Sequence, residues 1–245
     1  MESTSKEATV GCIKPTLHSG SHAELERLLP TGIHTIVRHF DIRQGTLDEF
    51  TEVMAGYDEA VRVHAEAGVD LIHPEGTPPF MLRGFAGERD IVDRWEAAYG
   101  IPVFTSAMSQ TDALKALGIR RFVGVGYDFE DMGIVARYFR DAGFEVLELD
   151  KPKNIPWQKI NDLTSDQVYE LIRALYGRCP SAEGIYIQGS KWRVLDVVDR
   201  IERTLGIPVV HPVTARCWAI QKRLSVERRV DGYGRLLSDL PPRVV

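Results

Sequence analysis

The sequence predicts an α/β protein made of two similar Rossmann-like lobes, each built on a parallel sheet, related by a pseudo-twofold axis and separated by a cleft. Short apolar or β-branched runs alternate with longer stretches of helical period along the 245 residues, which is typical of β–α units around a parallel sheet. In addition, Gly100-Ile101-Pro102-Val103 reappears as Gly206-Ile207-Pro208-Val209, each time between two helical stretches. This echo indicates two related halves.

In the first half, residues 1–119, short apolar runs bounded by turn residues predict strands at residues 10–14, 33–38, 69–73 and 103–105. The longer stretches between them carry apolar residues at the spacing of one helix face. They predict helices at residues 47–67, 89–99 and 110–117.

The second half, residues 120–245, repeats the same alternation. Strands are predicted at residues 122–126, 145–149, 184–188 and 209–211, and helices at residues 131–142, 165–175, 194–205 and 215–224. The C-terminal segment is also available to pack on the first lobe. Because ligands of open parallel sheets bind beyond the carboxyl ends of the strands, two such lobes facing each other place one active site in the cleft between them.

Composition excludes several classes of protein. With 44% hydrophobic and 27% charged residues and a net charge of −5, the chain is neither disordered nor fibrous, and it shows no basic footprint for nucleic acid. Three cysteines without C-x-x-C spacing suggest neither a disulfide framework nor a structural zinc site. No apolar leader, membrane-length apolar run or nucleotide-binding glycine motif is found, so we expect a cytoplasmic protein without a membrane partner.

Glycine turns follow the matching strands of the two halves. Gly76 precedes Thr77 after the strand at 69–73, and Gly189 precedes Ser190 after the strand at 184–188. Glycine lets the backbone approach a ligand closely, and amide groups at such a turn can hold a carboxylate. Pro78 suits the first turn of a helix but brings no N–H group. Such turns also occur in α/β proteins without any ligand role, so the repeat is what favours function here.

Two other strand ends carry candidate ligand contacts. Tyr127 follows the strand at 122–126, where its hydroxyl could donate to a ligand, although a buried structural tyrosine is an equal reading of the same position. The first strand ends at Pro15 and Thr16, a turn that could bind an anion.

Four stretches resemble the aspartate/glutamate racemase superfamily, and within it the arylmalonate decarboxylases and maleate isomerases. They are Gly11-Cys12-Ile13-Lys14-Pro15, then Gly76-Thr77 with Arg83-Gly84, then Tyr127, and finally Leu195-Asp196 onward through Glu202, Gly206-Ile207-Pro208-Val209 and Trp218. The ending Gly232-Tyr233-Gly234-Arg235-Leu236 looks like the decarboxylase. The resemblance covers nearly the whole chain.

The resemblance implies an enzyme without metal or cofactor that acts on a carbon next to a carboxylate. By position, Thr77 and Tyr127 match hydroxyl donors of an oxyanion hole, and the backbone around Gly76, Gly189 and Ser190 matches its amide donors. The two positions that carry cysteines in the racemases are Gly76 and Gly189 here. Racemisation by two thiols is therefore excluded, and the proton donor of the decarboxylases is missing as well.

Another residue must then supply the acid or base. His73 and Glu75 flank Pro74 at the end of a first-half strand, and a carboxylate confined near bound carboxylates is expected to have a raised pKa. His211, which ends the strand at 209–211, is a further candidate, and Lys191 is a candidate cation for a substrate carboxylate. For each of them a structural hydrogen bond is the alternative.

The sequence therefore predicts a decarboxylase-like lyase or an isomerase that forms an enediolate or carbanion on a small carboxylate substrate. Two alternatives stay open: water chemistry of the hydratase or hydrolase type on an unsaturated or ring substrate, and a carboxylate-binding sensor without catalysis. The identity of the substrate and the oligomeric state are also open.

Overall fold

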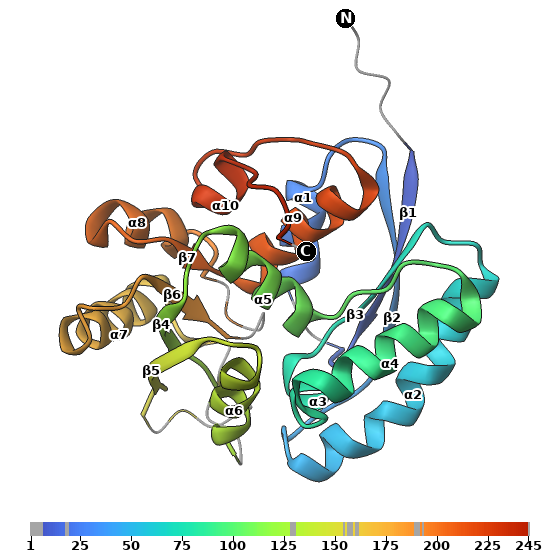
Figure 1. Cartoon of the computed structure of the whole chain (residues 1–245), viewed down its shortest axis with the longest axis horizontal. Helices are drawn as coiled ribbons and strands as arrows, with labels where there is room; N and C mark the ends of the chain where they lie inside the picture. Colours follow the sequence, from blue (N-terminus) through green and yellow to red (C-terminus); the bar gives the residue numbers. More distant parts are fainter. Residues whose placement is uncertain are drawn as a thin grey trace, which may run out of the picture.

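Two parallel sheets form the framework of the molecule (Figure 1). The computed structural model describes residues 7–17, 20–127, 131–153, 155, 159, 162–188, 192 and 194–244. The first sheet has the order β2-β1-β3, with β1 at Ala8–Lys14, β2 at Ile33–His39 and β3 at Leu71–Pro74. The second has the order β5-β4-β6-β7, with β4 at Arg121–Val125, β5 at Glu145–Asp150, β6 at Gly184–Ile187 and β7 at Val209–Val210. The predicted fold class is confirmed.

The helices connect and cover the strands. They are α1 (Ser21–Leu28), α2 (Leu47–Glu66), α3 (Thr77–Met81), α4 (Gly84–Tyr99), α5 (Ser106–Ala116), α6 (Gly133–Asp141), α7 (Ser165–Arg178), α8 (Val197–Leu205), α9 (Pro212–Leu224) and α10 (Arg235–Ser238). Helices α2 and α7 begin at capping boxes, in which Thr46 pairs with Glu49 and Thr164 pairs with Gln167. None of the described helices is long and apolar enough to cross a membrane.

The sequence echo has the same structure in both halves. Gly100 and Gly206 each end a helix in the left-handed conformation, with φ of 67° and 76°. The valine three positions later, Val103 or Val209, then joins the edge of a sheet. Its amide donates to the carboxylate of a glutamate in the preceding helix, at 2.7 Å in the first half and 2.9 Å in the second. The repeat therefore extends to side-chain contacts.

The predicted strand at 103–105 is wrong in extent, because only Val103 forms a bridge, to Ile72. The chain leaves the sheet immediately afterwards, since the Thr105 hydroxyl caps α5 by accepting from the amide of Met108. The predicted strand at 209–211 is shortened to β7 for the same reason, because His211 is the N-cap of α9.

Helices α5 and α9 lie between the two sheets at the centre of the molecule (Figure 1). They pack on each other; α5, from the first half, also reaches β7, and α9, from the second half, reaches α1 and β3. The C-terminal part of the chain thus packs on the first lobe. The boundary between residues 119 and 120 stays a prediction.

The two faces of the first sheet have different surroundings. Ile13 and Ile72 point into a small core with residues of α2, α3 and α4, including Tyr57, while Cys12 and Leu71 belong to the large core that spans both lobes. Because side chains alternate along a strand, Lys14 and His73 lie on the same face as Cys12. This face is the one on which α1 and α9 pack.

Candidate active site

The turn after β3 holds the first group of predicted site residues. Gly76 has φ of 104°, a conformation that favours glycine, and Thr77 begins α3 with its side chain buried. A Cβ atom at Gly76 would lie 2.8 Å from the Tyr57 hydroxyl oxygen and 3.1 Å from Cγ of Pro15. The Tyr57 hydroxyl also donates to the carbonyl of Glu75. The fold therefore brings the first and third strand ends together and leaves no room for a side chain at residue 76.

Glu75 lies in a buried cluster of charges. Nζ of Lys14 is 2.8 Å from Oε2 of Glu75, and the guanidinium of Arg216 contacts the same oxygen. All three side chains are almost completely buried. Oε1 of Glu75 has no hydrogen-bond partner among the described residues. Two cations surround one carboxylate, so the cluster carries a surplus positive charge.

The expected raised pKa of Glu75 is wrong. Burial by itself would raise it, but Arg216 and Lys14 outweigh burial and lower the pKa of Glu75 to about 2. Burial in turn lowers the pKa of Lys14. Glu75 is therefore ionised near neutral pH and has no proton to give to a substrate.

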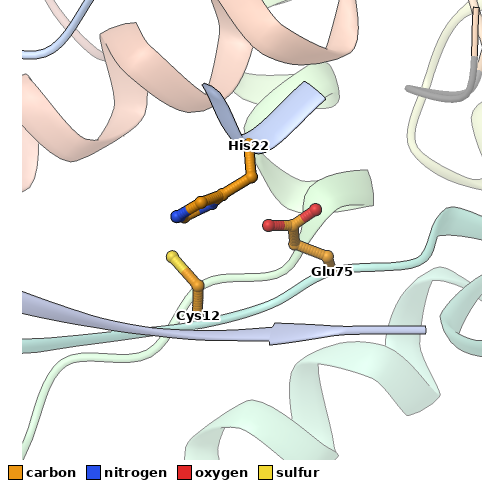
Figure 2. Close-up of side chains that lie close together, drawn as sticks. All are labelled: Cys12, His22 and Glu75. Carbon is orange, nitrogen blue, oxygen red and sulfur yellow. The ribbon is translucent and has the colours of Figure 1, made fainter. Parts of the chain in front are cut away.

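Cys12, His22 and Glu75 point toward one another above β1 (Figure 2), and one possible ligand atom of each lies within 4.8 Å of the others. This set does not suit a divalent metal, because Lys14 and Arg216 already hold Glu75 and would repel a further cation. Burial also raises the pKa of the Cys12 thiol to about 12, so it stays protonated. We therefore assign the group to the charged cluster rather than to a metal centre.

His73 is completely buried, and its tautomer is defined by its neighbours. Nδ1 lies 2.8 Å from the carbonyl oxygen of Phe104, and the imidazole stacks on the Phe104 ring at 4.2 Å. Because a carbonyl can only accept, the proton is on Nδ1. Burial lowers the pKa of His73 to about 3, so the ring is neutral and Nε2 carries a lone pair. That nitrogen has no partner within the described part of the chain.

His211 is buried in the opposite tautomer. Its Nδ1 accepts from the amide of Val213 at 3.2 Å, which places the ring proton on Nε2. Burial, followed by the charge of Arg216, lowers the pKa of His211 to about 3. The Nε2–H group has no acceptor among the residues described. The two predicted histidines thus differ in kind: His73 presents an acceptor and His211 presents a donor.

Neutral side chains occupy the positions that match Glu75 and Arg216 in the internal repeat. Gln188 directly follows β6 as Glu75 directly follows β3, and Gln110 occupies the position in α5 that Arg216 occupies in α9. The Tyr186 hydroxyl donates to Oε1 of Gln110 at 2.8 Å, whereas the side-chain amide of Gln188 is buried and has no partner among the described residues. The repeat of this site that Gln110 and Gln188 form is therefore uncharged at both positions.

Tyr127 lies just beyond β4, as predicted, and is 4% exposed. Its ring packs edge-on against Trp192, with the ring centroids 5.2 Å apart. Pro78 is half-buried in the first turn of α3, and the carbonyl of Thr16 is 3.2 Å from Nδ1 of His39.

The predicted residues Gly189, Ser190 and Lys191 lie outside the described part of the chain. Sequence reasoning missed Lys14, Arg216 and the two glutamines. Arg216 could have been found as the one charge in the apolar run Ala215–Ile220.

Comparisons with known proteins agree with this architecture. The family model described as arylmalonate decarboxylase matches residues 10–237. Arylmalonate decarboxylase of Bordetella bronchiseptica is 25% identical over 239 residues, covering 94% of this chain and 97% of that protein.

Solved structures show the same fold. A double mutant of arylmalonate decarboxylase in its liganded form has a TM-score of 0.86 at 21% identity, covering 95% of this chain and 99% of its own. The maleate isomerase Iso of Pseudomonas putida S16 has a TM-score of 0.84 at 21% identity, covering 96% and 100%.

Proposed function

The chain belongs to the arylmalonate decarboxylase family, and we propose that it is a cofactor-independent enzyme that forms an enediolate or carbanion on a small carboxylate, as a lyase or an isomerase. The observation that carries this proposal is the neutral imidazole of His73 beside the surplus positive charge of Lys14, Glu75 and Arg216. A substrate carboxylate in the cleft would offset that charge.

Binding and oxyanion stabilisation would come from the strand-end turns. Among the described residues, we propose the hydroxyls of Thr77 and Tyr127 and the amides of Gly76 and Thr77 as the donors. Preorganised donors in a water-poor site can contribute several kcal/mol to an enediolate-like transition state. From the second lobe, we propose the amides of Gly189 and Ser190 and the charge of Lys191 as further contacts.

We assign the proton transfer to His73 rather than to Glu75 or His211. Glu75 is held ionised by two cations. A protonated His211 would lose the bond that its Nδ1 accepts from Val213. A protonated His73 instead keeps its Nδ1–H bond to the Phe104 carbonyl and gains a proton on Nε2. The negative charge of a bound substrate raises the pKa of a nearby imidazole, so binding itself would load His73 with the proton.

The two reactions then differ in what leaves the α-carbon. In decarboxylation the bond to one carboxylate breaks, carbon dioxide leaves, and the electron pair passes into the enediolate of the remaining carboxyl group. The imidazolium of His73 gives its Nε2 proton to the α-carbon and is reprotonated from solvent. Isomerisation starts instead from the neutral form of His73: Nε2 takes the α-proton, a proton from solvent adds to the opposite face of the enediolate, and the imidazolium then returns its proton to solvent. In both reactions the Nε2–H group of His211 would donate a hydrogen bond to the substrate and keep its proton.

The test is proton NMR in D2O with purified protein and a panel of substituted malonates, maleate and α-substituted carboxylates. We expect loss of carboxylate or entry of deuterium at the α-carbon. Both Tyr127→Phe and His73→Asn should slow this about 100-fold or more. Asparagine retains a donor for the Phe104 carbonyl but lacks the Nε2 lone pair.

Two controls separate catalysis from folding. His34→Asn removes an exposed imidazole on β2 and should leave turnover unchanged. His211→Asn preserves a capping oxygen for α9 and should slow turnover less than His73→Asn does. Unchanged turnover in Tyr127→Phe and His73→Asn would refute the assigned roles. Binding without turnover across the panel would favour water chemistry or a carboxylate sensor instead.

A further inference from the structure

A pocket of about 400 Å³ lies where α4, α9 and the C-terminal segment meet, and none of its lining residues belongs to the candidate active site. Four of them are cations: Arg89 from α4, Lys222 and Arg223 from α9, and Arg243 near the C-terminus. Pockets of this volume hold small molecules.

The arginines of this pocket share a single buried carboxylate. Asp112, on α5, is 3.1 Å from Arg223, 3.3 Å from Arg243 and 3.9 Å from Arg89. One carboxylate cannot satisfy the donors of three guanidinium groups. Nη1 of Arg223 and Nε of Arg243 are buried and have no partner among the described residues. Buried donors of this kind are normally satisfied, so these two are available to an anionic ligand.

Arg223 is built into the wall of the pocket. Its side chain is 7% exposed, and its guanidinium lies over the Phe104 ring with Cζ 4.4 Å from the ring centroid. The Phe104 ring also contacts His73, whose imidazole stacks on it with the ring centroids 4.2 Å apart. Arg223 and the candidate catalytic histidine therefore contact the same aromatic ring.

The acidic residues around the pocket do not satisfy these donors. Glu96 already accepts from the amide of Val103 at 2.7 Å, and Asp93 is exposed. Glu227 is 2.7 Å from Lys222 but is itself largely exposed. The buried part of the pocket is therefore rich in donors.

We propose that this pocket is a second ligand site, which binds a small molecule through a phosphate or carboxylate group. Nη1 of Arg223 and Nε of Arg243 would donate to the anion, and Arg89 and Lys222 would add positive charge. Arginine forks suit both anions because they can donate two parallel hydrogen bonds to paired oxygens. This site is independent of the chemistry proposed for the cleft.

The test is isothermal titration of the purified protein with inorganic phosphate in one arm and citrate in the other. We expect at least one of them to bind with a Kd below ~1 mM, and the tighter of the two identifies a phosphate or a carboxylate ligand. Arg243→Gln and Arg223→Gln should each weaken that binding at least tenfold. Arg140→Gln, which removes an exposed charge at the end of α6, should not.

Arg243 is 32% exposed, so its variant remains informative even if the loss of Arg223 prevents folding. The proposal would be overturned if neither anion bound the wild-type protein, or if Arg243→Gln bound as tightly as Arg140→Gln.

Discussion

Replacement of Glu75 by glutamine would test the charged cluster directly. The substitution keeps the size of the side chain but leaves Lys14 and Arg216 buried without their shared carboxylate. Removing one partner of a buried ion pair typically costs about 3–5 kcal/mol. The pKa of about 2 in the folded protein, against an ordinary value of 4.5, independently corresponds to ~3 kcal/mol of stability at neutral pH. We therefore expect Glu75→Gln to lower the free energy of unfolding by about 3 kcal/mol at pH 7.

The same pKa gives this effect a pH dependence. Because folding lowers the pKa of Glu75, the carboxylate stabilises the protein fully above pH 4.5 and loses this contribution as pH falls toward 2. In the variant the contribution is absent at every pH. The difference in stability between the two proteins should therefore shrink on acidification, to roughly half its neutral value at pH 3.

The assay is urea unfolding of both proteins at pH 7 and pH 3, followed by circular dichroism. Glu66→Gln is the matched control, because it removes the carboxylate of an exposed ion pair with Arg62 and should leave stability unchanged. The description of the cluster would be refuted if Glu75→Gln unfolded like the control, or if the loss of stability were the same at both pH values.

Two further predictions concern backbone strain and a buried carboxyl group. Gly76→Ala should destabilise the protein by about 1–3 kcal/mol, because φ at residue 76 is 104° and the new Cβ would press on Tyr57 and Pro15. In the control Gly177→Ala, on α7, the new Cβ meets nothing within 4 Å and should not destabilise the protein. Thermal unfolding measures both variants, and equal melting temperatures would contradict the predicted strain at residue 76. Burial raises the pKa of Glu88 to about 7, and this side chain joins α4 to α5 and α6. The wild type should therefore lose stability relative to Glu88→Gln as pH rises from 4.5 to 7. Urea unfolding of both proteins at pH 5 and pH 8 measures this, and a stability difference that did not change with pH would disprove it.

Much of the fold could be predicted because it depends on local patterns. Short apolar runs and glycine caps report strands and helix ends within a few residues, and the echo at Gly100 and Gly206 identified the two halves. The predicted strands were too long at Thr105 and His211. Both residues fit the residue pattern of a strand, but each is the N-cap of the following helix, so the strand cannot include it.

The sequence placed the candidate residues at the ends of strands, but it did not predict their electrostatics. Glu75 was expected to carry a proton, yet its partners come from β1 and from α9 in the other half of the chain. Nothing near residue 75 in the sequence indicates those contacts. Likewise, the opposite tautomers of His73 and His211 depend on two backbone groups, the Phe104 carbonyl and the Val213 amide.

The sequence by itself determined the α/β class, the two-fold repeat and the residues at the strand ends, because these follow from periodicity and from the conformations of glycine and proline. The tertiary structure alone decided which of those residues are charged, neutral or sterically confined. A pKa depends on burial and on charges within a few ångströms, and packing α9 on the first lobe is what brings Arg216 to Glu75.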